Sequence, residues 1–382
     1  MRNRREFLQG MAQTAGAIAL GSIRSDRAAV FGRGIRQSAT RTDTQNEGDL
    51  GNGTRREVRI NGKRVKTVDV HCHCTVDVRD IVKGTILERA GGGGGGSLDN
   101  AVGPRRLQVM DAQGIDVEVL SINAFWYAAE EDLARKLIDY QNHKLADMCA
   151  AYPGRFFAFA SVALQFPELA AQQLEDGMKH QGLRGAAIGE SVEGEELSAR
   201  KFDPFWAKAE ELDAMIFLHP QSSEETTGIA KRVRGPGALG NVIGNPLEST
   251  IALSHLIFDG TMDRFPKLKL CTAHGGGFLP SYVDRMDHGC TVVPSSCKGL
   301  ELKHKPSEYI RELYFDSLVF TGEGLRHLVA NTQASHIMIG TDYPFPWVTD
   351  PVGHVLGTPT LSVSDKVAIL GGNACSLLKI PA

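Results

Sequence analysis

From Lys66 to the C-terminal end, short apolar runs alternate with longer amphipathic stretches, and this alternation constrains the fold more than any other feature. Strands that alternate with helices predict parallel β/α units. Eight such units over about 250–320 residues predict a closed (β/α)8 barrel of the TIM type. An open, doubly wound sheet is the alternative, although no Gly-x-Gly-x-x-Gly fingerprint follows the first strand. The expected strands are Thr67–Val70, Val117–Ile122, Phe156–Val162, Gly185–Ile188, Met215–Leu218, Leu268–Thr272, Leu313–Asp316 and Ile337–Gly340.

The segments between the expected strands carry apolar residues at helical spacing. Ahead of the first strand, apolar residues alternate on both sides of Asn61-Gly62, a pair that favours the two-residue turn of a hairpin. We therefore expect a short hairpin before the barrel. The clearest expected helices are Glu131–Tyr152, Pro167–Gln181, Pro204–Leu212 and Gly322–Asn331.

The N-terminal segment is similar to a twin-arginine export signal. Arg4 and Arg5 stand just before Phe7 and Leu8, and a weakly apolar stretch of glycine and alanine follows. An amphipathic helix of a cytosolic protein is the alternative, and the stretch is too short for a membrane span, which needs about 20 apolar residues. We expect a signal over residues 1–30, a polar linker over 31–56, a barrel over 57–382, and a periplasmic or otherwise exported protein.

The charge balance limits the range of partners. The net charge of -3 over 382 residues argues against a nucleic-acid surface, which needs a clear basic excess, and stable membrane insertion is not expected. The expected partner is a small molecule.

The cysteines give no sign of a disulfide-stabilised fold, because seven cysteines at irregular spacing do not predict a disulfide framework.

The strongest local motif is His71-Cys72-His73 at the end of the first expected strand. Residues two apart on a strand face the same side, so both imidazoles point together and can chelate a metal such as Zn²⁺. Cys72 and Cys74 then point the other way, which disfavours a four-ligand Cys/His knuckle. Asp69 shares the histidines' side and is expected to orient one of them.

Three further polar residues follow later strands. His219 comes directly after the fifth expected strand, His274 after the sixth and Asp342 after the eighth. In a closed barrel these strand ends share one rim, and active sites lie on that rim. Each residue alone is more often a packing or capping residue, but together with the two histidines of the first strand they predict a metal site.

Taken together, these motifs resemble the amidohydrolase superfamily, and most closely the branch typified by aminocarboxymuconate-semialdehyde decarboxylase. The resemblance extends from Lys66 nearly to the end of the chain. Its segments are Val68–His73, Phe217–Pro220, Asn245–Glu248, Arg264–Leu268, Ala273–Gly277, Tyr314–Ser317, Gly340–Pro346 and Gly372–Ala374.

The resemblance implies a metal-dependent hydrolase type of barrel with one divalent metal. His71, His73, His219 and Asp342 would be its ligands, with Zn²⁺ expected and Mn²⁺ as the alternative. His274, together with Asp342, would be catalytic and act as acid/base beside a metal-bound water. A metal lowers the pKa of such a water from about 15.7 towards about 7. No lysine stands where a bridging ligand would, so a second metal is not expected.

Two arginines match positions that hold substrate carboxylates in this branch. Arg106 begins an Arg-x-x-x-Met-Asp stretch, and Arg285 follows His274 on the next segment. A guanidinium suits bidentate carboxylate binding. In the branch the second arginine comes from a neighbouring subunit, which implies a homodimer or larger homo-oligomer. Ordinary surface salt bridges are the alternative for both.

Aromatic residues near the expected rim are Phe125, Trp126, Tyr127 and Trp347. They either line the pocket, with Trp126 as a substrate contact, or pack the rim. The loop over 221–240 contains no tryptophan, which departs from the decarboxylase pattern. The identity of the substrate therefore stays open.

The resulting functional prediction is a non-oxidative decarboxylase, a carbon–carbon lyase, of an unsaturated or aromatic carboxylic acid. A metal hydrolase of an amide, ester or lactone is the alternative, and a noncatalytic metal-binding barrel is a third class. Six consecutive glycines, Gly91 to Gly96, cannot form a stable element. They form either a flexible lid or a low-complexity expansion without a role.

Overall fold

The computed structural model describes residues 55–91, 101–221 and 229–381. The expected export signal, nearly all of the linker and most of the glycine run lie outside these described residues. Within them, no helix combines the length and apolar character that crossing a membrane would require.

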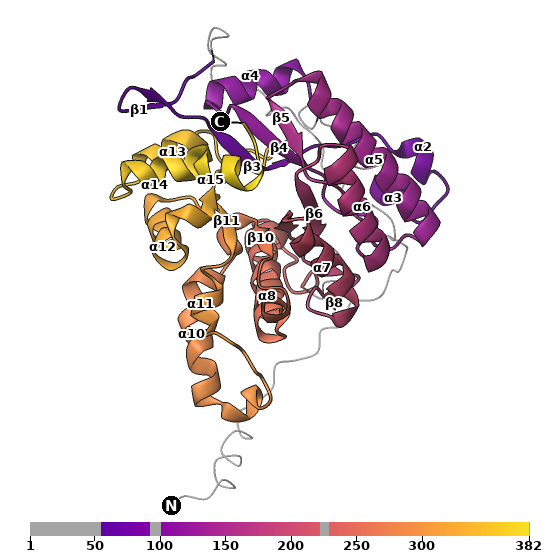
Figure 1. The fold of residues 1–382 in the computed structure, drawn as a ribbon, viewed down its shortest axis with the longest axis vertical. Helices are drawn as coiled ribbons and strands as arrows, with labels where there is room; N and C mark the ends of the chain where they lie inside the picture. Colours follow the sequence, from indigo (N-terminus) through magenta and orange to yellow (C-terminus); the bar gives the residue numbers. More distant parts are fainter. Residues whose placement is uncertain (1–54, 92–100, 222–228, 382) are drawn as a thin grey trace, which may run out of the picture. The chain divides into compact units, whose positions relative to one another are not determined.

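The strands of the barrel form two parallel sheets that meet edge to edge (Figure 1). One sheet holds β3, β4 and β5, and the other has the order β12-β11-β10-β9-β6. A bridge between Ala160 and Ala186 joins β5 to β6, and bridges Asp69–Ile339 and Cys72–Tyr343 join β3 to the end of β12. The described strands thus close into the eight-stranded barrel that the sequence predicts. Their bounds are β3 Val68–His73, β4 Val117–Ser121, β5 Phe156–Ala158, β6 Gly185–Gly189, β9 Met215–His219, β10 Lys269–Thr272, β11 Tyr314–Asp316 and β12 Ile337–Met338.

The junction between β3 and the end of β12, here called the β3–β12 seam, runs through His71. Its backbone oxygen accepts hydrogen bonds from the amides of Thr341, at 3.1 Å, and Asp342, at 2.8 Å. The His73 amide donates to Tyr343 O at 2.7 Å. The first and last strands of the barrel are therefore joined at the residues that the sequence selects as metal ligands.

The strands are buried on both faces, as parallel strands covered by helices must be. Val68 and Val70 of β3 belong to the cluster inside the barrel, whereas Cys72 belongs to the larger cluster between strands and helices. Inside the barrel, the rings of Phe159 and Phe217 stack with centroids 5.7 Å apart. This inner layer fills the barrel beneath the rim and leaves the site at the strand ends.

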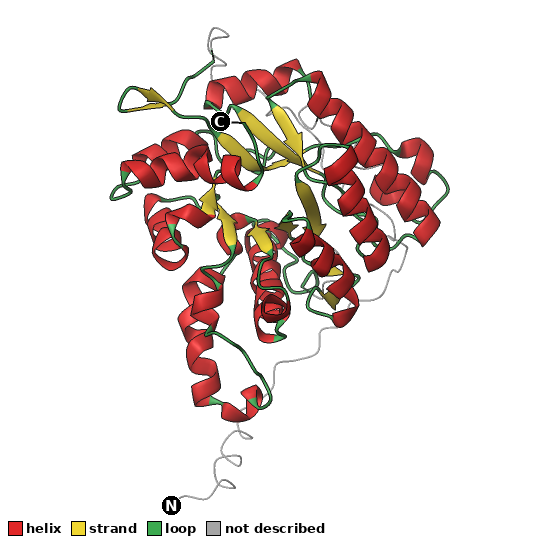
Figure 2. Ribbon diagram, in the orientation of Figure 1, coloured by secondary structure: helices red, strands yellow, loops and turns green. Residues whose placement is uncertain are grey.

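Helices lie outside the strands (Figure 2). The four helices singled out in the sequence all form, with ends shifted by one residue at most. The α-helices are α2 Arg79–Val82, α3 Glu88–Gly91, α4 Pro104–Gln113, α5 Glu131–Ala151, α6 Pro167–His180, α7 Asp203–Glu211, α8 Asn245–Phe258, α9 Thr261–Arg264, α10 Leu279–Val292, α11 Pro306–Tyr309, α12 Gly322–Thr332, α13 Pro351–Gly357, α14 Val363–Val367 and α15 Asn373–Leu377. Shorter elements are η2 Arg200–Phe202, η4 Gly240–Gly244, η5 His274–Gly276, η6 Pro294–Cys297, η7 Ala334–His336, η8 Ala368–Gly372 and the β7 Ser191–Val192 and β8 Glu195–Glu196 pair.

The expected hairpin precedes the barrel. Its strands β1 Arg59–Ile60 and β2 Lys63–Arg64 pair antiparallel. Asn61 and Gly62 have φ values of 50° and 77°, as a two-residue turn with left-handed central residues requires.

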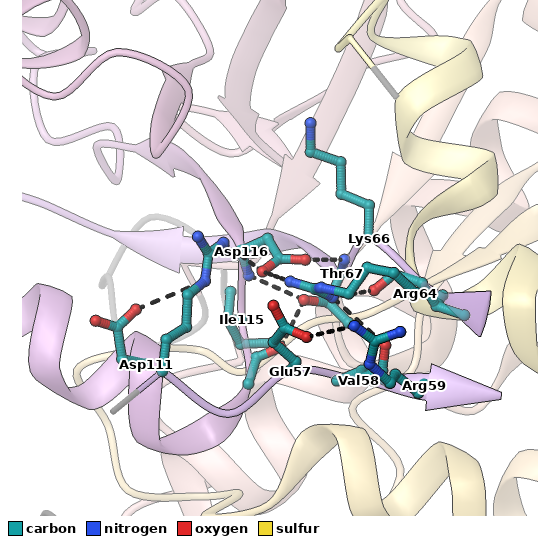
Figure 3. Close-up of polar contacts among 12 residues, drawn as sticks. Glu57, Val58, Arg59, Arg64, Lys66, Thr67, Asp111, Ile115 and Asp116 are labelled. Atoms are coloured by element: carbon teal, nitrogen blue, oxygen red, sulfur yellow. Dashed lines mark hydrogen bonds and ion pairs between the residues drawn. The ribbon is translucent and has the colours of Figure 1, made fainter. Parts of the chain in front are cut away.

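Asp116 ties this hairpin to the start of β3 (Figure 3). One carboxylate oxygen accepts from the Thr67 amide at 2.9 Å, and the other accepts from Arg64 Nη2 at 2.5 Å and from Arg55. Burial alone would raise the pKa of Asp116, but these hydrogen bonds and the arginine charges lower the pKa below its usual value.

We expect Asp116→Ala to lower the free energy of unfolding at pH 7 by about 1–3 kcal/mol, because it leaves the buried Thr67 amide without its acceptor and removes the partner of Arg55 and Arg64. The carboxylate has a depressed pKa in the folded state. Its contribution is therefore present above the unfolded pKa of about 3.9 and is lost as pH falls through the folded value. Urea unfolding of wild type and variant at pH 7 and at low pH measures this, with Asp147→Ala on the exposed face of α5 as the control. Equal losses in both variants would contradict the prediction.

One cysteine pair is bonded. Cys290 at the end of α10 and Cys297 of η6 form a disulfide, with their Cα atoms 5.4 Å apart. The cysteine spacing did not predict this bridge, because the pairing depends on the chain reversal between these two elements. The other described cysteines are free.

Candidate metal centre and active site

Five polar side chains converge at the carboxyl ends of the strands. His71 and His73 are on β3, His219 ends β9, His274 follows β10 and Asp342 follows β12. All but His274 are buried. A register shift in β3 between Asp69 and Cys72 interrupts the alternation after Val70, and beyond it His71 and His73, two residues apart, share the inner side.

The atoms of these side chains lie close enough to share one ion. Asp342 Oδ1 is 2.8 Å from His73 Nε2 and 3.3 Å from His71 Nε2, while Asp342 Oδ2 is 3.8 Å from His274 Nε2. Ligand atoms of His71, His219, His274 and Asp342 all lie within 4.8 Å of one another. His73 completes the group, since its ring centroid is 4.6 Å from that of His219.

The residues fit a bound cation because several imidazole nitrogens lack other partners. Both ring nitrogens of His219 are buried without a hydrogen-bond partner among the described residues, and His71 Nε2 has none with good geometry. Buried polar atoms of this kind are rare in native proteins unless a ligand satisfies them.

The charge states also fit a cation. Burial lowers the pKa of His73 and lowers that of His219 further, so both rings are neutral and can coordinate. The neighbouring histidines lower the pKa of Asp342 against the effect of burial, which keeps it ionised. Burial also opposes charging His71, but Asp342 and Asp316 raise the pKa of His71 to about 10, so a cation would displace that proton.

Asp316, at the end of β11, orients the His71 ring through Nδ1, the ring nitrogen that does not face Asp342. Its Oδ2 lies 2.5 Å from His71 Nδ1, and its two oxygens accept from the amides of His274, at 2.9 Å, and Gly275, at 2.8 Å. The sequence pattern predicted this orienting role for Asp69 instead. That prediction is wrong, because Asp69 accepts from the His71 backbone amide and from Thr341 Oγ1, and the carboxylate bonded to the His71 ring nitrogen Nδ1 is that of Asp316.

We expect Asp316→Asn to weaken metal binding by about 10–100-fold, because the ring of His71 loses the carboxylate that fixes its orientation and its basicity. Chelator competition on the purified protein measures the affinity. Asp147→Asn, far from the site on α5, is the matched control. An unchanged affinity in Asp316→Asn would show that Asp316 does not orient the ligand.

Two residues of the site have backbone conformations that side chains rarely adopt. His274 has φ 54° and Asp342 has φ 60°, both in the left-handed region. Such strain persists only where the surrounding structure enforces it, and it gathers at functional sites. After His274 the turn needs glycine, since a Cβ on Gly277, at φ 63°, would lie 2.0 Å from Pro246 O.

Cavities open on two sides of the centre. One of about 300 Å³ is lined by His274, Asn241, Val242, Phe278, Phe320 and Trp347, among others. Another of about 250 Å³ is lined by His73, Val78, Asn123, Phe125, Gln141 and Phe345, among others. No Lys, Arg, Asp or Glu occurs among the described residues that line either cavity. Both cavities therefore suit the uncharged body of a ligand.

Two predicted substrate contacts are not at these cavities and need correction. Trp126 is fully buried, and its Nε1 donates to Val162 O at 2.9 Å. Arg106 is buried in an ion pair, with Nε 2.5 Å from Glu118 and Nη1 2.7 Å from His73 O. Side-chain packing behind the rim, which the sequence pattern does not reveal, directs both away from the cavities.

The remaining candidates fall at different places. Phe125 and Trp347 line cavities, which agrees with the first of the two roles considered for the aromatic residues, lining the pocket and not only packing the rim. Arg285 lies exposed on α10 of the same chain. Its proposed entry into a neighbouring subunit's site stays a prediction.

The structure is a closed parallel barrel that carries three buried histidines, a carboxylate and a further histidine at the carboxyl ends of its strands. These features define the class of metal-dependent enzymes whose reaction takes place at the barrel rim.

Comparison with known proteins identifies the family. The chain belongs to the amidohydrolase family, whose sequence profile matches residues 68–380. It is 33% identical over 276 residues to 2-amino-3-carboxymuconate-6-semialdehyde decarboxylase of Dictyostelium discoideum, covering 72% of this chain and 75% of the relative. It is 31% identical over 291 residues to gamma-resorcylate decarboxylase of Rhizobium radiobacter, covering 72% of this chain and 86% of the relative.

A solved structure agrees with this assignment. The fold matches that of a dihydroxybenzoic acid decarboxylase from Polaromonas sp. JS666, with bound manganese and the inhibitor 2-nitroresorcinol, at a TM-score of 0.67 and 25% identity. The match covers 82% of this chain and 97% of that one. The predicted fold class and superfamily branch are confirmed.

Proposed function

We propose that the chain is a metal-dependent, non-oxidative decarboxylase of an aromatic or unsaturated carboxylic acid. The observation that carries the proposal is the position of His274. Its side chain is 15% exposed and lines a cavity, whereas the side chains of His71 and Asp342 beside it are 0% and 4% exposed. A histidine at the edge of a buried ligand set is placed to exchange a proton with a substrate.

The roles of the side chains follow from this arrangement. His71, His73, His219 and Asp342 would hold a divalent cation, which supplies Lewis-acid chemistry to the oxygens of the substrate when bound. His274 gives a proton to the carbon that loses CO₂, and Asp342 Oδ2, 3.8 Å away, stabilises the charged imidazole. The apolar walls of the cavity exclude water from that carbon. The names of both relatives favour this reaction over hydrolysis.

For the identity of the metal we propose Zn²⁺, because three imidazoles and one carboxylate form a donor set typical of it. Mn²⁺ is the alternative, and the manganese in the structure of the dihydroxybenzoic acid decarboxylase supports it. Loading the protein with each ion in turn separates the two.

Metal removal tests the reaction. We expect the purified protein to contain about one metal per chain and to release CO₂ from members of a panel of aromatic and unsaturated carboxylic acids. Chelation should lower the rate at least ~100-fold, and added Zn²⁺ or Mn²⁺ should restore it, since the metal supplies several kcal/mol of charge stabilisation. Cleavage with water uptake and without CO₂ would establish a hydrolase instead.

We also propose that the protein is exported through the twin-arginine pathway and acts in the periplasm. Arg4-Arg5 ahead of Phe7-Leu8 supports this, and so does the Cys290–Cys297 disulfide, because disulfides persist in oxidising compartments. Cell fractionation tests it. Full-length, unprocessed protein confined to the cytosol would contradict it.

The assembly that we propose is a homodimer or larger homo-oligomer in which Arg285 of one chain reaches a neighbour's site. Its exposure on α10 is consistent with that role. Sedimentation analysis tests the assembly, and an active monomer would contradict it.

A further inference from the structure

A buried glutamine beside the candidate site has no hydrogen-bond partner. Gln141 lies on α5 and is 1% exposed, and neither its Nε2 nor its Oε1 is paired within the described part of the chain. Its neighbour Asn142 uses both amide atoms, since Nδ2 donates to Ser161 O at 3.0 Å and Oδ1 accepts from Ser161 N at 2.8 Å. Burying an unpaired amide costs stability, so Gln141 is an exception that needs a reason.

Gln141 lines the cavity of about 250 Å³ that also borders His73. The cavity therefore adjoins the metal centre on one side and a free amide on another. Most of its remaining wall is apolar, with Val78, Phe125 and Phe345 among the residues. An aromatic ring fits such a wall, and one polar substituent on the ring would meet Gln141.

The chemistry of the wall defines that substituent. None of the described residues that line the cavity carries a formal charge of its own apart from the titratable His73, so a charged substituent would be buried without a counter-charge. An amide offers both a donor and an acceptor. A hydroxyl group can use both at once, because it accepts from Nε2 and donates to Oε1.

We infer that Gln141 binds an uncharged hydroxyl group on the ring of the substrate and thereby determines specificity for hydroxylated aromatic acids. The inference rests on the proposed function and adds that the ring enters the cavity beside His73, with the carboxylate at the histidine cluster between the two cavities, where His274 can reach the carbon that bears it. Gln141 would contact a substituent of the ring and not the carbon that loses CO₂, so it acts on binding and not on proton transfer.

The test compares two ligands of nearly equal shape, 2,6-dihydroxybenzoate and 2,6-dimethylbenzoate, on the metal-loaded full chain. Their affinities are measured by isothermal titration calorimetry for wild type and for Gln141→Met, which keeps the volume and removes the amide. Both proteins carry His274→Ala in addition, so that neither decarboxylates the ligand during the titration. We expect wild type to prefer the hydroxylated ligand, and the variant to reduce that preference by about 10-fold, the effect of one or two neutral hydrogen bonds. A hydroxyl that contacts the metal does so in both proteins, so the change in preference isolates Gln141.

Gln173→Met is the matched control. Gln173 is also a buried glutamine, but it lies on α6 and its Oε1 accepts from Ala163 N at 2.8 Å. Gln141→Met should keep or raise the thermal midpoint of wild type, because it removes a buried unpaired amide, whereas Gln173→Met should lower the midpoint and keep the ligand preference.

The inference is overturned if wild type shows no preference, if Gln141→Met retains it in full, or if Gln173→Met loses it equally. Because the affinities are measured without turnover, these outcomes are separate from a failure of the proposed function, which would appear as the absence of CO₂ release from every acid.

Discussion

Replacing His274 by alanine should lower the rate of CO₂ release by about 100- to 10,000-fold and leave the metal content unchanged. The reason is its position at the edge of the cluster. Its Nε2 is 3.8 Å from Asp342 Oδ2, and its ring lines a cavity, so it can deliver a proton to a bound substrate. The four proposed ligands, His71, His73, His219 and Asp342, all remain in the variant.

The measurement combines metal analysis with a CO₂ assay on the same preparation. His143→Ala, on the exposed face of α5, is the control and should match wild type in both. Loss of the metal from His274→Ala would place His274 among the ligands, which its distances to the cluster also permit. Full activity in the variant would exclude it as the acid/base.

Replacing His219 by alanine should abolish both metal binding and turnover. Neither ring nitrogen of His219 has a partner among the described residues, so binding a cation accounts for the position of this ring better than packing does. Loss of a residue that only orients a ligand weakens metal binding by at most ~100-fold. Removing a direct ligand should weaken metal binding by more than that.

Thermal unfolding with and without added metal distinguishes a ligand from a structural residue. A ligand stabilises only the metal-bound protein, so His219→Ala should unfold at the midpoint of metal-free wild type and should not respond to added metal. A variant that is destabilised equally in both conditions, or that still gains stability from the metal, would contradict the assignment.

The barrel could be predicted because its strands are short apolar runs at regular intervals, and because parallel strands of a closed barrel end on one rim. That rule also places His219, His274 and Asp342 near the β3 histidines without knowledge of any contact. The same rule could have identified Asp316, because this residue ends the seventh expected strand. The segment Tyr314–Ser317 was matched to the family, but no function was predicted for Asp316 in it.

Other features depend on packing that no local pattern encodes. Arg106 lies on a stretch with the expected motif and Trp126 lies near the expected rim. Each turns into the interior, where the Glu118 carboxylate accepts from Arg106 and the Val162 backbone oxygen accepts from Trp126. The Cys290–Cys297 bridge requires the chain to reverse after α10. The unpaired amide of Gln141 is visible only when all of its neighbours are placed.

The β3–β12 seam has a consequence for biosynthesis. Two of the proposed ligands come from its first strand and one from the segment after its last strand, and the same backbone hydrogen bonds close the ring and position Asp342. A nascent chain therefore cannot assemble the ligand set until residue 342 has left the ribosome. A cation held by all four proposed ligands can therefore be bound only after that point, and a chain that ends before residue 342 lacks the carboxylate.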